Sequence, residues 1–339
     1  MNKSFFILFV IIFNIRVYAQ MYDFKDFDFN KADQIAYSQK GKSLKNFSSL
    51  AYNLTDTLTT DVEKFRSIYT WVCTNIEGDY IASVINKEKR KKLQKNNLKL
   101  NNWNISFRTK VFEKLLNEHK TVCTGYAFLI KLLSNLANIE CVIIDGYGRT
   151  ANNEIGKNPI PNHSWNAVKL NSKWYLCDAT WSSGSYNYEK SQFTYDYNDG
   201  YFLTNPELFI KDHYPLDSNW VLTNQPYDLS NFMNQPFVYG NTYKYGILPI
   251  KPCEMNIEVE QYKETQFLLN TSKPIYTSQI KIELVSGTNS QAVEPTKIHL
   301  KDNSLEIIYK FENKGLYDVH FKIDNNVVLT YVVKVKKAK

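Results

Sequence analysis

The chain has 339 residues, which exceeds one average domain, so two domains are the natural expectation. Its 41 Lys and Arg residues against 34 Asp and Glu residues give a net charge of +7, which is a mild excess. No nucleic-acid-binding motif accompanies that charge, so the composition argues against a nucleic-acid-binding protein. Five cysteines in a chain of this size also argue against a disulfide-framework protein.

Residues 1–19 have the three parts of a secretory signal peptide. Lys3 supplies the positive start, an unbroken apolar run covers 5–13, and 17–19 form a small-residue cleavage site. The apolar run is shorter than the ~20 residues that a membrane-spanning helix needs. No cysteine follows the predicted cut, so no lipid anchor is expected. We therefore predict a secreted, periplasmic or cell-surface protein without a membrane span; a buried N-terminal strand is the alternative for this segment.

A core-facing helix is expected from residue 60 to about 75. Thr60 followed by Glu63 is a capping-box pattern, which marks the start of a helix. Apolar side chains then recur at helical spacing, namely Val62, Phe65, Ile68, Tyr69, Val72 and Ile76.

A basic insertion occupies about 86–102. Between Lys87 and Lys99 it carries seven Lys or Arg residues and Glu88 as its one acid. Such a run could contact nucleic acid, but a solvated surface insertion is the interpretation we favour for a secreted protein.

The middle of the chain mixes helices and strands. In order, the pattern predicts a short helix near Val111 and Leu115, a buried helix from Tyr126 to about 138, a strand at 140–147, a polar loop at 149–162, and strands at 163–170 and 173–180 joined by a hairpin at Asn171-Ser172.

At about residue 240 the pattern changes to short alternating runs. Seven of them are expected to be strands, at 256–259, 266–269, 280–284, 297–300, 305–311, 317–323 and 327–335. This spacing predicts a small β-sandwich of immunoglobulin-like type. We therefore divide the chain into residues 1–19 (signal peptide), 20–238 (a mixed α+β domain) and 239–339 (the β-sandwich). The last part contains no catalytic grouping, so a binding or positioning role is expected for it.

Three residues form the pattern of a thiol catalytic triad: Cys123 at a helix start, His163 at a strand start and Asp178 at the end of the next strand. In a hairpin centred on Asn171-Ser172, facing residues have numbers that sum to 343. His163 and Asp178 then lie on one face as diagonal neighbours, within ~7 Å between their Cβ atoms. A slip of one residue would place them on opposite faces.

The chemistry of such a trio is well defined. The aspartate would orient the imidazole of His163 so that its other nitrogen faces Cys123. A free thiol has a pKa of ~8.5, and only the thiolate attacks carbonyl groups well, so Cys123 needs that help. The N–H groups at a helix start, including that of Cys123, could contribute to an oxyanion hole worth ~3 kcal/mol per donor.

Other interpretations exist for each residue taken alone. A cysteine at a helix start can simply pack, a histidine at a strand start can be a hydrogen-bonded core group, and an aspartate before Ala-Thr can be a turn former or cap. A zinc site is disfavoured because the close ligand pairs CxxC and HxxxH are absent. The remaining cysteines could form up to two disulfides or be small buried side chains, and the sequence leaves both open: Cys73, Cys141, Cys177 and Cys253.

The segments Thr121–Ala127, His163–Asn166 and Asp178–Trp181 together resemble the transglutaminase-like superfamily, whose core carries Gly-x-Cys-x-Gly-Tyr-Ala, His-Ala-Trp-Asn and Asp-x-Thr-Trp motifs. The likeness is nearest to the branch that includes the kyphoscoliosis peptidase and secreted bacterial relatives. That branch also shows an Ile-Tyr-Thr-Trp helix, here at 68–71, and a tail with a His-x-Pro motif, here within 202–220. The resemblance covers about residues 30–222.

The resemblance implies a papain-like α+β fold, with Cys123 as nucleophile, His163 as general base and acid, and Asp178 as orienting residue. Thr121 departs from the glycine that the family has two residues before the cysteine, and the basic insertion is not part of the family pattern. Transglutaminases also use an upstream aromatic residue in the oxyanion hole, for which Trp103 is the candidate here. The calcium sites of animal transglutaminases have no visible counterpart.

These observations predict a secreted cysteine enzyme that acts on amide bonds through a thioester, with a protein or peptide as substrate and no cofactor or metal. Peptidase or amidase hydrolysis is favoured over transglutaminase transfer by fold-level analogy. The alternatives are an inactive module that binds peptides or glycans, and a structural surface protein. The oligomeric state is not indicated by the sequence.

Overall fold

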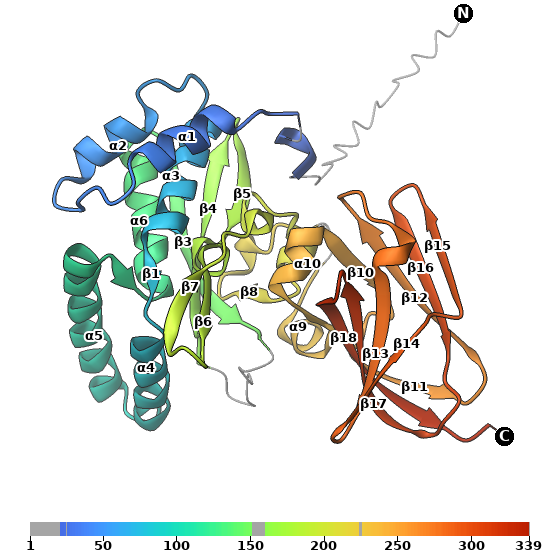
Figure 1. Ribbon diagram of the computed structural model, residues 1–339. Coiled ribbons are helices and arrows are strands. Elements are labelled where there is room, and N and C mark those ends of the chain that lie inside the picture. Colours follow the sequence, from blue (N-terminus) through green and yellow to red (C-terminus); the bar gives the residue numbers. More distant parts are fainter. Residues whose placement is uncertain (1–20, 25, 151–159, 224–225, 339) are drawn as a thin grey trace, which may run out of the picture.

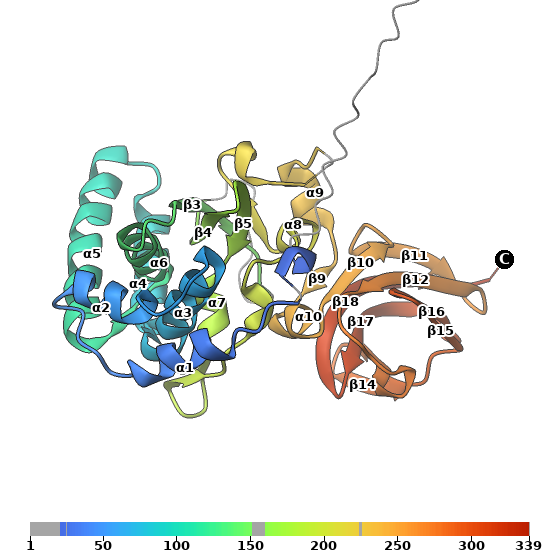
Figure 2. The ribbon, with the colours of Figure 1, turned by 90° about the horizontal axis from the view of Figure 1, so that it is seen from above.

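The computed structural model describes residues 21–24, 26–150, 160–223 and 226–338. A helix-rich half and a β-rich half lie side by side in two perpendicular views (Figures 1 and 2). The predicted signal peptide, residues 1–19, lies outside the described residues. Within the described ranges no helix has the length and apolar character needed to cross a membrane.

The central helix of the first half is α3 (Asp61–Asn75). Its predicted capping box is confirmed, since the Glu63 amide donates to Thr60 Oγ1 at 3.3 Å and the Thr60 amide donates to Glu63 Oε2 at 3.0 Å. The helix is buried on several sides, because it packs against α1 (Asn30–Ser38), α2 (Phe47–Thr55) and α6 (Cys123–Leu136).

A four-stranded antiparallel sheet lies beside these helices in the order β5-β4-β3-β8. Its strands are β3 (Cys141–Gly148), β4 (His163–Leu170), β5 (Lys173–Cys177) and β8 (His213–Pro215). Helix α6 packs on β3 and β4, so the start of α6 and the start of β4 belong to neighbouring elements.

The predicted hairpin register is confirmed: Asn166 pairs with Cys177 and Leu170 with Lys173. Asn171 and Ser172 have φ of 49° and 63°, the positive values that a two-residue type I′ turn requires. The predicted end of the second strand at residue 180 is wrong. The strand stops at Cys177, because Asp178 caps the short helix α7 (Ala179–Ser183).

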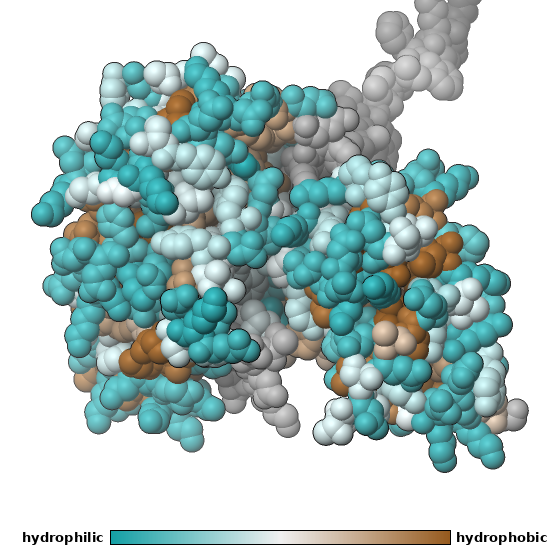
Figure 3. Space-filling model, viewed as in Figure 1, coloured by the Kyte–Doolittle hydropathy of each residue, from teal (hydrophilic) through white to brown (hydrophobic). Residues whose placement is uncertain are grey.

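The basic insertion forms a helical hairpin of α4 (Tyr80–Leu93) and α5 (Asn97–Glu118). Their first turns are capped by Asp79 and Asn96, whose side chains accept hydrogen bonds from backbone amides. No residue of α4 is buried, and hydrophobic surface shows on this part of the molecule in Figure 3. The insertion is thus surface-exposed, as predicted, and it is helical.

Short elements connect the sheet to the C-terminal half and complete the first half. They are η1 (Met21–Phe24), β1 (Glu77–Gly78), β2 (Lys120–Thr121), β6 (Gly184–Asn187), β7 (Gln192–Tyr195), η2 (Asp199–Tyr201), α8 (Pro206–Phe209), η3 (Ser218–Trp220), α9 (Leu229–Asn234), β9 (Phe237–Val238) and α10 (Gly240–Tyr245).

The C-terminal half contains two sheets. One has the order β10-β12-β16-β15, and the other has the order β11-β18-β17-β13-β14 with β9 added on β18. The pairing is antiparallel except between β11 and β18. The strands are β10 (Ile247–Lys251), β11 (Asn256–Glu260), β12 (Glu264–Thr271), β13 (Ile280–Ser286), β14 (Asn289–Val293), β15 (Lys297–Lys301), β16 (Ser304–Lys310), β17 (Gly315–Ile323) and β18 (Asn326–Lys336). A short 3-10 helix, η4 (Thr277–Gln279), comes directly before β13.

The two halves share one hydrophobic cluster. It joins Trp165 and Leu176 of the central sheet to Tyr201, and these to Phe267 and Tyr331 of the β-rich half. The predicted domain boundary after residue 238 falls between β9 and α10, and both of these elements contact β18. The β-rich half therefore packs directly against the elements that support the central sheet.

Candidate active site

Cys123 is the first residue of α6 and is partly exposed. The preceding Val122 has φ −104° and ψ 178°, and no side chain caps the helix start. The first N–H groups of a helix lack partners within the helix and carry a partial positive charge. The start of α6 can therefore stabilise negative charge on the Cys123 sulfur or on a nearby oxygen.

His163 and Asp178 are hydrogen-bonded and buried. His163 Nε2 lies 2.8 Å from Asp178 Oδ2, and the two residues are 7% and 1% exposed. Because Nε2 is engaged by Asp178, Nδ1 remains for Cys123. Burial alone would lower the pKa of His163, but the charge of Asp178 and the hydrogen bonds with Asp178 and Cys123 outweigh it and raise the pKa to about 10. The structure thus joins His163 to Asp178, and Cys123 enters through its effect on the pKa of His163.

The two oxygens of Asp178 have separate roles. Oδ1 accepts a hydrogen bond from the Thr180 amide at 2.8 Å and so caps α7, while Oδ2 faces His163. The backbone carbonyl of Asp178 accepts from the Tyr69 hydroxyl at 2.9 Å. The interpretation of this aspartate as a helix cap is therefore confirmed, and the same carboxylate also contacts His163.

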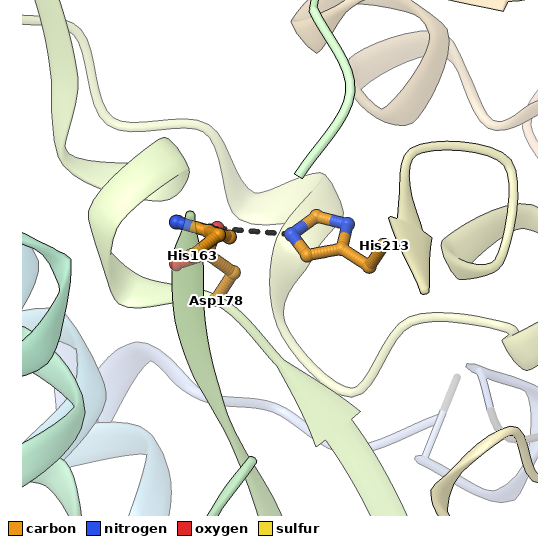
Figure 4. Close-up of side chains that lie close together, drawn as sticks. All are labelled: His163, Asp178 and His213. Atoms are coloured by element: carbon orange, nitrogen blue, oxygen red, sulfur yellow. Dashed lines mark hydrogen bonds and ion pairs between the residues drawn. The ribbon is translucent and has the colours of Figure 1, made fainter. Parts of the chain in front are cut away.

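His213 is a site residue to which the sequence analysis gave no role. Its Nε2 lies 3.1 Å from Asp178 Oδ2, and its Nδ1 lies 2.6 Å from Asp212 Oδ1. Figure 4 shows the ring of His213 approaching the His163–Asp178 pair from β8. The sequence feature that could have pointed to His213 is the His-x-Pro motif in the tail of the family pattern. The pairing of β8 with β3 is what brings His213 to Asp178.

Aromatic rings hold both histidines in place. Trp181 stacks on His163 with ring centroids 4.7 Å apart and an interplanar angle of 19°, and Phe209 stacks on His213 at 3.9 Å and 19°. Trp165 meets His213 edge-on at 5.1 Å. These contacts restrict rotation of the rings, so the hydrogen bonds to Asp178 are kept in one arrangement.

Arg90 of α4 is a second residue that the sequence analysis did not assign. Its Nη1 donates to the Pro161 carbonyl at 2.6 Å, which ties α4 to the chain just before β4. Burial lowers the pKa of Arg90, and the charges of Cys123 and Asp145 oppose this. The basic helix therefore brings a positive charge near Cys123.

Trp103 does not lie free for an oxyanion hole. Its indole N–H donates to Asn86 Oδ1 at 2.9 Å, and its ring stacks on Phe107 at 5.8 Å. Both partners lie in the α4–α5 hairpin, so the side chain of Trp103 serves the packing of that hairpin.

Among the described residues, one group could present three metal-ligand atoms within 4.8 Å of one another: His163, Asp178 and His213. The two histidine nitrogens lie 2.8 Å and 3.1 Å from the same Asp178 oxygen. Hydrogen bonds account for both distances.

All five cysteines lie in the described ranges and none is in a disulfide. Cys73, Cys141 and Cys177 are buried, and burial raises the pKa of each thiol, to about 12 for Cys141. Of the two alternatives left open by the sequence, the structure shows free, buried side chains at these three positions. Cys253 is exposed and lies in the β-rich half.

Residues 48–179 match the model of the transglutaminase-like superfamily. The chain is 34% identical over 239 residues to kyphoscoliosis peptidase of Homo sapiens, covering 70% of this chain and 33% of that protein. It is 29% identical over 233 residues to hillarin of Drosophila melanogaster and 26% identical over 232 residues to Lim and transglutaminase domain protein ltd-1 of Caenorhabditis elegans. These matches cover 65% of this chain in both cases, and 26% and 29% of the relatives. The chain thus spans about a third or less of the length of these relatives. It belongs to the transglutaminase-like superfamily, in the branch that contains kyphoscoliosis peptidase.

Proposed function

We propose that the protein is a secreted cysteine enzyme that cleaves amide bonds, with Cys123 as nucleophile, His163 as general base and acid, and Asp178 as orienting residue. The observation that carries the proposal is the buried hydrogen bond from His163 Nε2 to Asp178, which leaves Nδ1 for the thiol at the start of α6. A binding module would not need a buried acid–base pair beside a partly exposed thiol.

The reaction begins with Cys123 as the thiolate, because only the thiolate attacks carbonyl groups well. His163, with its pKa raised to about 10, keeps a proton at neutral pH. The thiolate attacks the carbonyl carbon of a peptide or glutamine-type amide, and the electron pair of the C=O bond moves to the oxygen. The N–H groups at the start of α6 stabilise the resulting oxyanion.

Collapse of this intermediate breaks the C–N bond and leaves a thioester on Cys123. His163 Nδ1 gives its proton to the departing amine, which leaves neutral. A water molecule then attacks the thioester while His163 accepts one of its protons, and the carboxylic acid and the Cys123 thiolate are released as His163 returns to the imidazolium form. An amine in place of water would give acyl transfer instead. The name of the human and mouse relatives, kyphoscoliosis peptidase, favours hydrolysis.

The β-rich half supports the proposal as a positioning unit. Its two packed sheets, with residues from each facing the shared cluster, are those of a sandwich, and we propose an immunoglobulin-like one for residues 239–339. The apolar N-terminal segment 5–13 supports export from the cytoplasm.

Site-resolved alkylation tests the nucleophile. The folded protein is treated with iodoacetamide at pH 6, where less than about one per cent of an ordinary thiol is ionised. Labelling at each cysteine is then followed by mass spectrometry. We expect Cys123 to react at least about tenfold faster than the exposed Cys253, which serves as an internal reference. His163→Ala should remove that advantage.

Equal rates at Cys123 and Cys253, or a rate at Cys123 that His163→Ala does not change, would contradict the proposed Cys–His pair. The protein would then be better described as a peptide- or glycan-binding module. If the pair is present, incubation with a glutamine-containing protein and a fluorescent amine separates the two reactions. Hydrolysis releases ammonia or new N-termini, and transfer attaches the amine, with Cys123→Ala as the control.

A further inference from the structure

Behind the Cys123–His163–Asp178 centre lies a second acid–histidine pair. His213 contacts Asp178 through Nε2 and Asp212 through Nδ1, and the Tyr243 hydroxyl donates a hydrogen bond to the same Asp212 oxygen. Asp178, Asp212 and His213 are each 1–2% exposed. A buried group of this kind needs a complete set of hydrogen bonds, because each unpaired polar atom costs ~1–3 kcal/mol.

The hydrogen-bond directions follow from the chemistry of the partners. An ionised carboxylate only accepts, so a neutral imidazole between two carboxylates could satisfy one of them and not the other. The set is complete when His213 carries protons on both nitrogens, or when Asp212 carries a proton that it donates to Nδ1. In both cases His213 Nε2 donates to Asp178 Oδ2.

We propose that His213 is a positioning residue of this centre: it fixes Asp178 Oδ2 and takes up part of the negative charge that Asp178 would otherwise direct at His163 alone. This rests on the proposed function. The reaction requires His163 to hold a proton and then to release it. A buried carboxylate with a single imidazole partner would favour the imidazolium more strongly than one whose charge is shared by two donors.

The surroundings of His213 contain few other charges. Besides Asp178 and Asp212, the titratable groups that face it from the elements packed around it are His163 with its ring 5.3 Å away, Tyr201 at 6.3 Å, Tyr243, and Arg149, whose backbone amide donates to the Asp212 carbonyl. Burial lowers the pKa of Arg149 to about 10, against the opposing charges of Tyr227 and Asp212, so Arg149 remains a cation at neutral pH. The remaining walls are aromatic rings. Titration of His163 is therefore coupled to Asp178 and Cys123 directly, and to the His213–Asp212 pair through Asp178.

The supporting chain reaches the β-rich half. Tyr243 lies on α10, and the neighbouring Thr242 hydroxyl donates to the Val328 carbonyl of β18. The Tyr239 hydroxyl is paired with Thr330 Oγ1 at 2.8 Å. Hydrogen bonds thus run from β18 through α10, Asp212 and His213 to Asp178, which gives the β-rich half a direct part in holding the orienting residue.

The role of His213 can be tested by following the protonation of each histidine, because the chain has few of them. The protein has five, so nuclear magnetic resonance of ¹⁵N-histidine-labelled full chain can resolve each ring and follow its protonation between pH 5 and 11. We expect His213 Nε2 to carry a proton throughout the neutral range. In His213→Leu, which removes the donor, the midpoint of His163 should rise by about one pH unit, since Asp178 then has one imidazole partner. His213→Gln, which keeps an N–H donor, should return the His163 midpoint most of the way to its wild-type value.

Two further variants separate positioning from packing. Asp212→Asn is nearly isosteric and should move the His163 midpoint in the same direction by a smaller amount, which covers the case in which His213→Leu fails to fold. His299→Leu is the matched control, since His299 lies exposed in β15 of the β-rich half. It should leave the His163 midpoint unchanged.

The proposal is overturned if His213 Nε2 carries no proton, or if folded His213→Leu or Asp212→Asn leaves the His163 midpoint where it is in the wild type. This readout does not require turnover or a reactive thiol. A shift of the His163 midpoint together with an unreactive Cys123 would therefore contradict the proposed enzyme while supporting the role of His213.

Discussion

At the scale of single residues, the contact between Thr121 and position 125 fixes the turn that presents Cys123. A Cβ atom added to Gly125 would lie 1.9 Å from Thr121 Oγ1 and 2.8 Å from Thr121 Cβ. The family pattern has glycine at the position of Thr121, so in this chain a larger residue fills that space. Gly125 is thus required here by its neighbour rather than by its own backbone conformation.

Gly125→Ala should accordingly disturb the start of α6. Overpacking costs roughly 1–3 kcal/mol, and relief of the clash would displace Cys123. We expect a lower melting temperature and at least about tenfold slower alkylation of Cys123 at pH 6.

The double variant Thr121→Gly, Gly125→Ala removes the three nearest atoms and should recover most of both losses. Thr121 Oγ1 is buried and has no hydrogen-bond partner in the described structure, so its removal breaks no hydrogen bond. If the single Gly125→Ala variant has the wild-type melting temperature and the wild-type rate of Cys123 alkylation, the turn can shift without loss of stability and the argument is wrong.

The residues of the centre that could be predicted from the sequence are those whose contacts are close together in the chain. His163 and Asp178 are joined by one hairpin, so alternation and a two-residue turn were enough to place them on one face. His213 reaches Asp178 only because β8 pairs with β3, some 65 positions earlier in the chain. Such a contact depends on the packing of the whole sheet, and no local spacing reports it.

At the scale of elements, the Asn171-Ser172 turn sets the register on which the His163–Asp178 contact depends. Both residues have positive φ, a region where non-glycine residues are strained and β-branched residues are rarely found. We expect Ser172→Gly to raise stability by up to ~1 kcal/mol, because glycine adopts φ of 63° without that strain.

Ser172→Val should instead lower stability by a similar or larger amount. Thermal unfolding of the two variants measures both effects, and Cys123 alkylation in Ser172→Gly should match the wild type, since the register is unchanged. A stabilising effect of valine would mean that the turn is not of the type described.

The insertion shows why element boundaries were harder to predict than the trio. Its charge indicated solvent exposure correctly, since α4 has no buried residue. Two residues of α5, Val111 and Leu115, are buried, and so sparse an apolar pattern does not reveal the length of a helix; α5 is therefore much longer than the short helix predicted near Val111. The contact of Arg90 with the Pro161 carbonyl was not predicted either, because no sequence pattern marks a contact of that kind.

At the scale of the whole molecule, the shared hydrophobic cluster makes the two halves interdependent. Trp165 and Leu176 of the central sheet are 1% and 2% exposed in the full chain and belong to the same cluster as residues of β12 and β18. A chain that ends after Val238 would expose Tyr201 and Phe209, which pack on that cluster. We expect it to lose the selective alkylation of Cys123.

The full chain should unfold in one calorimetric transition rather than two. Scanning calorimetry and alkylation of the truncated chain provide the measurement. Two well-separated transitions, or a truncated chain with wild-type Cys123 reactivity, would contradict this dependence. All seven strands expected in this half are present. No sequence pattern indicated that their core continues into the first half, because the joining residues are ordinary apolar side chains.

The position of β18 has a consequence for biosynthesis. This strand follows every other described strand in the chain, yet it pairs with β9, β11 and β17 and holds α10 through Thr242. While the chain is being synthesised, the helices and the central sheet emerge first and cannot complete the support of Asp178 until β18 arrives. Contacts of such long sequence separation form slowly. A nascent chain would therefore hold Asp178 without its full set of supporting contacts until β18 has docked.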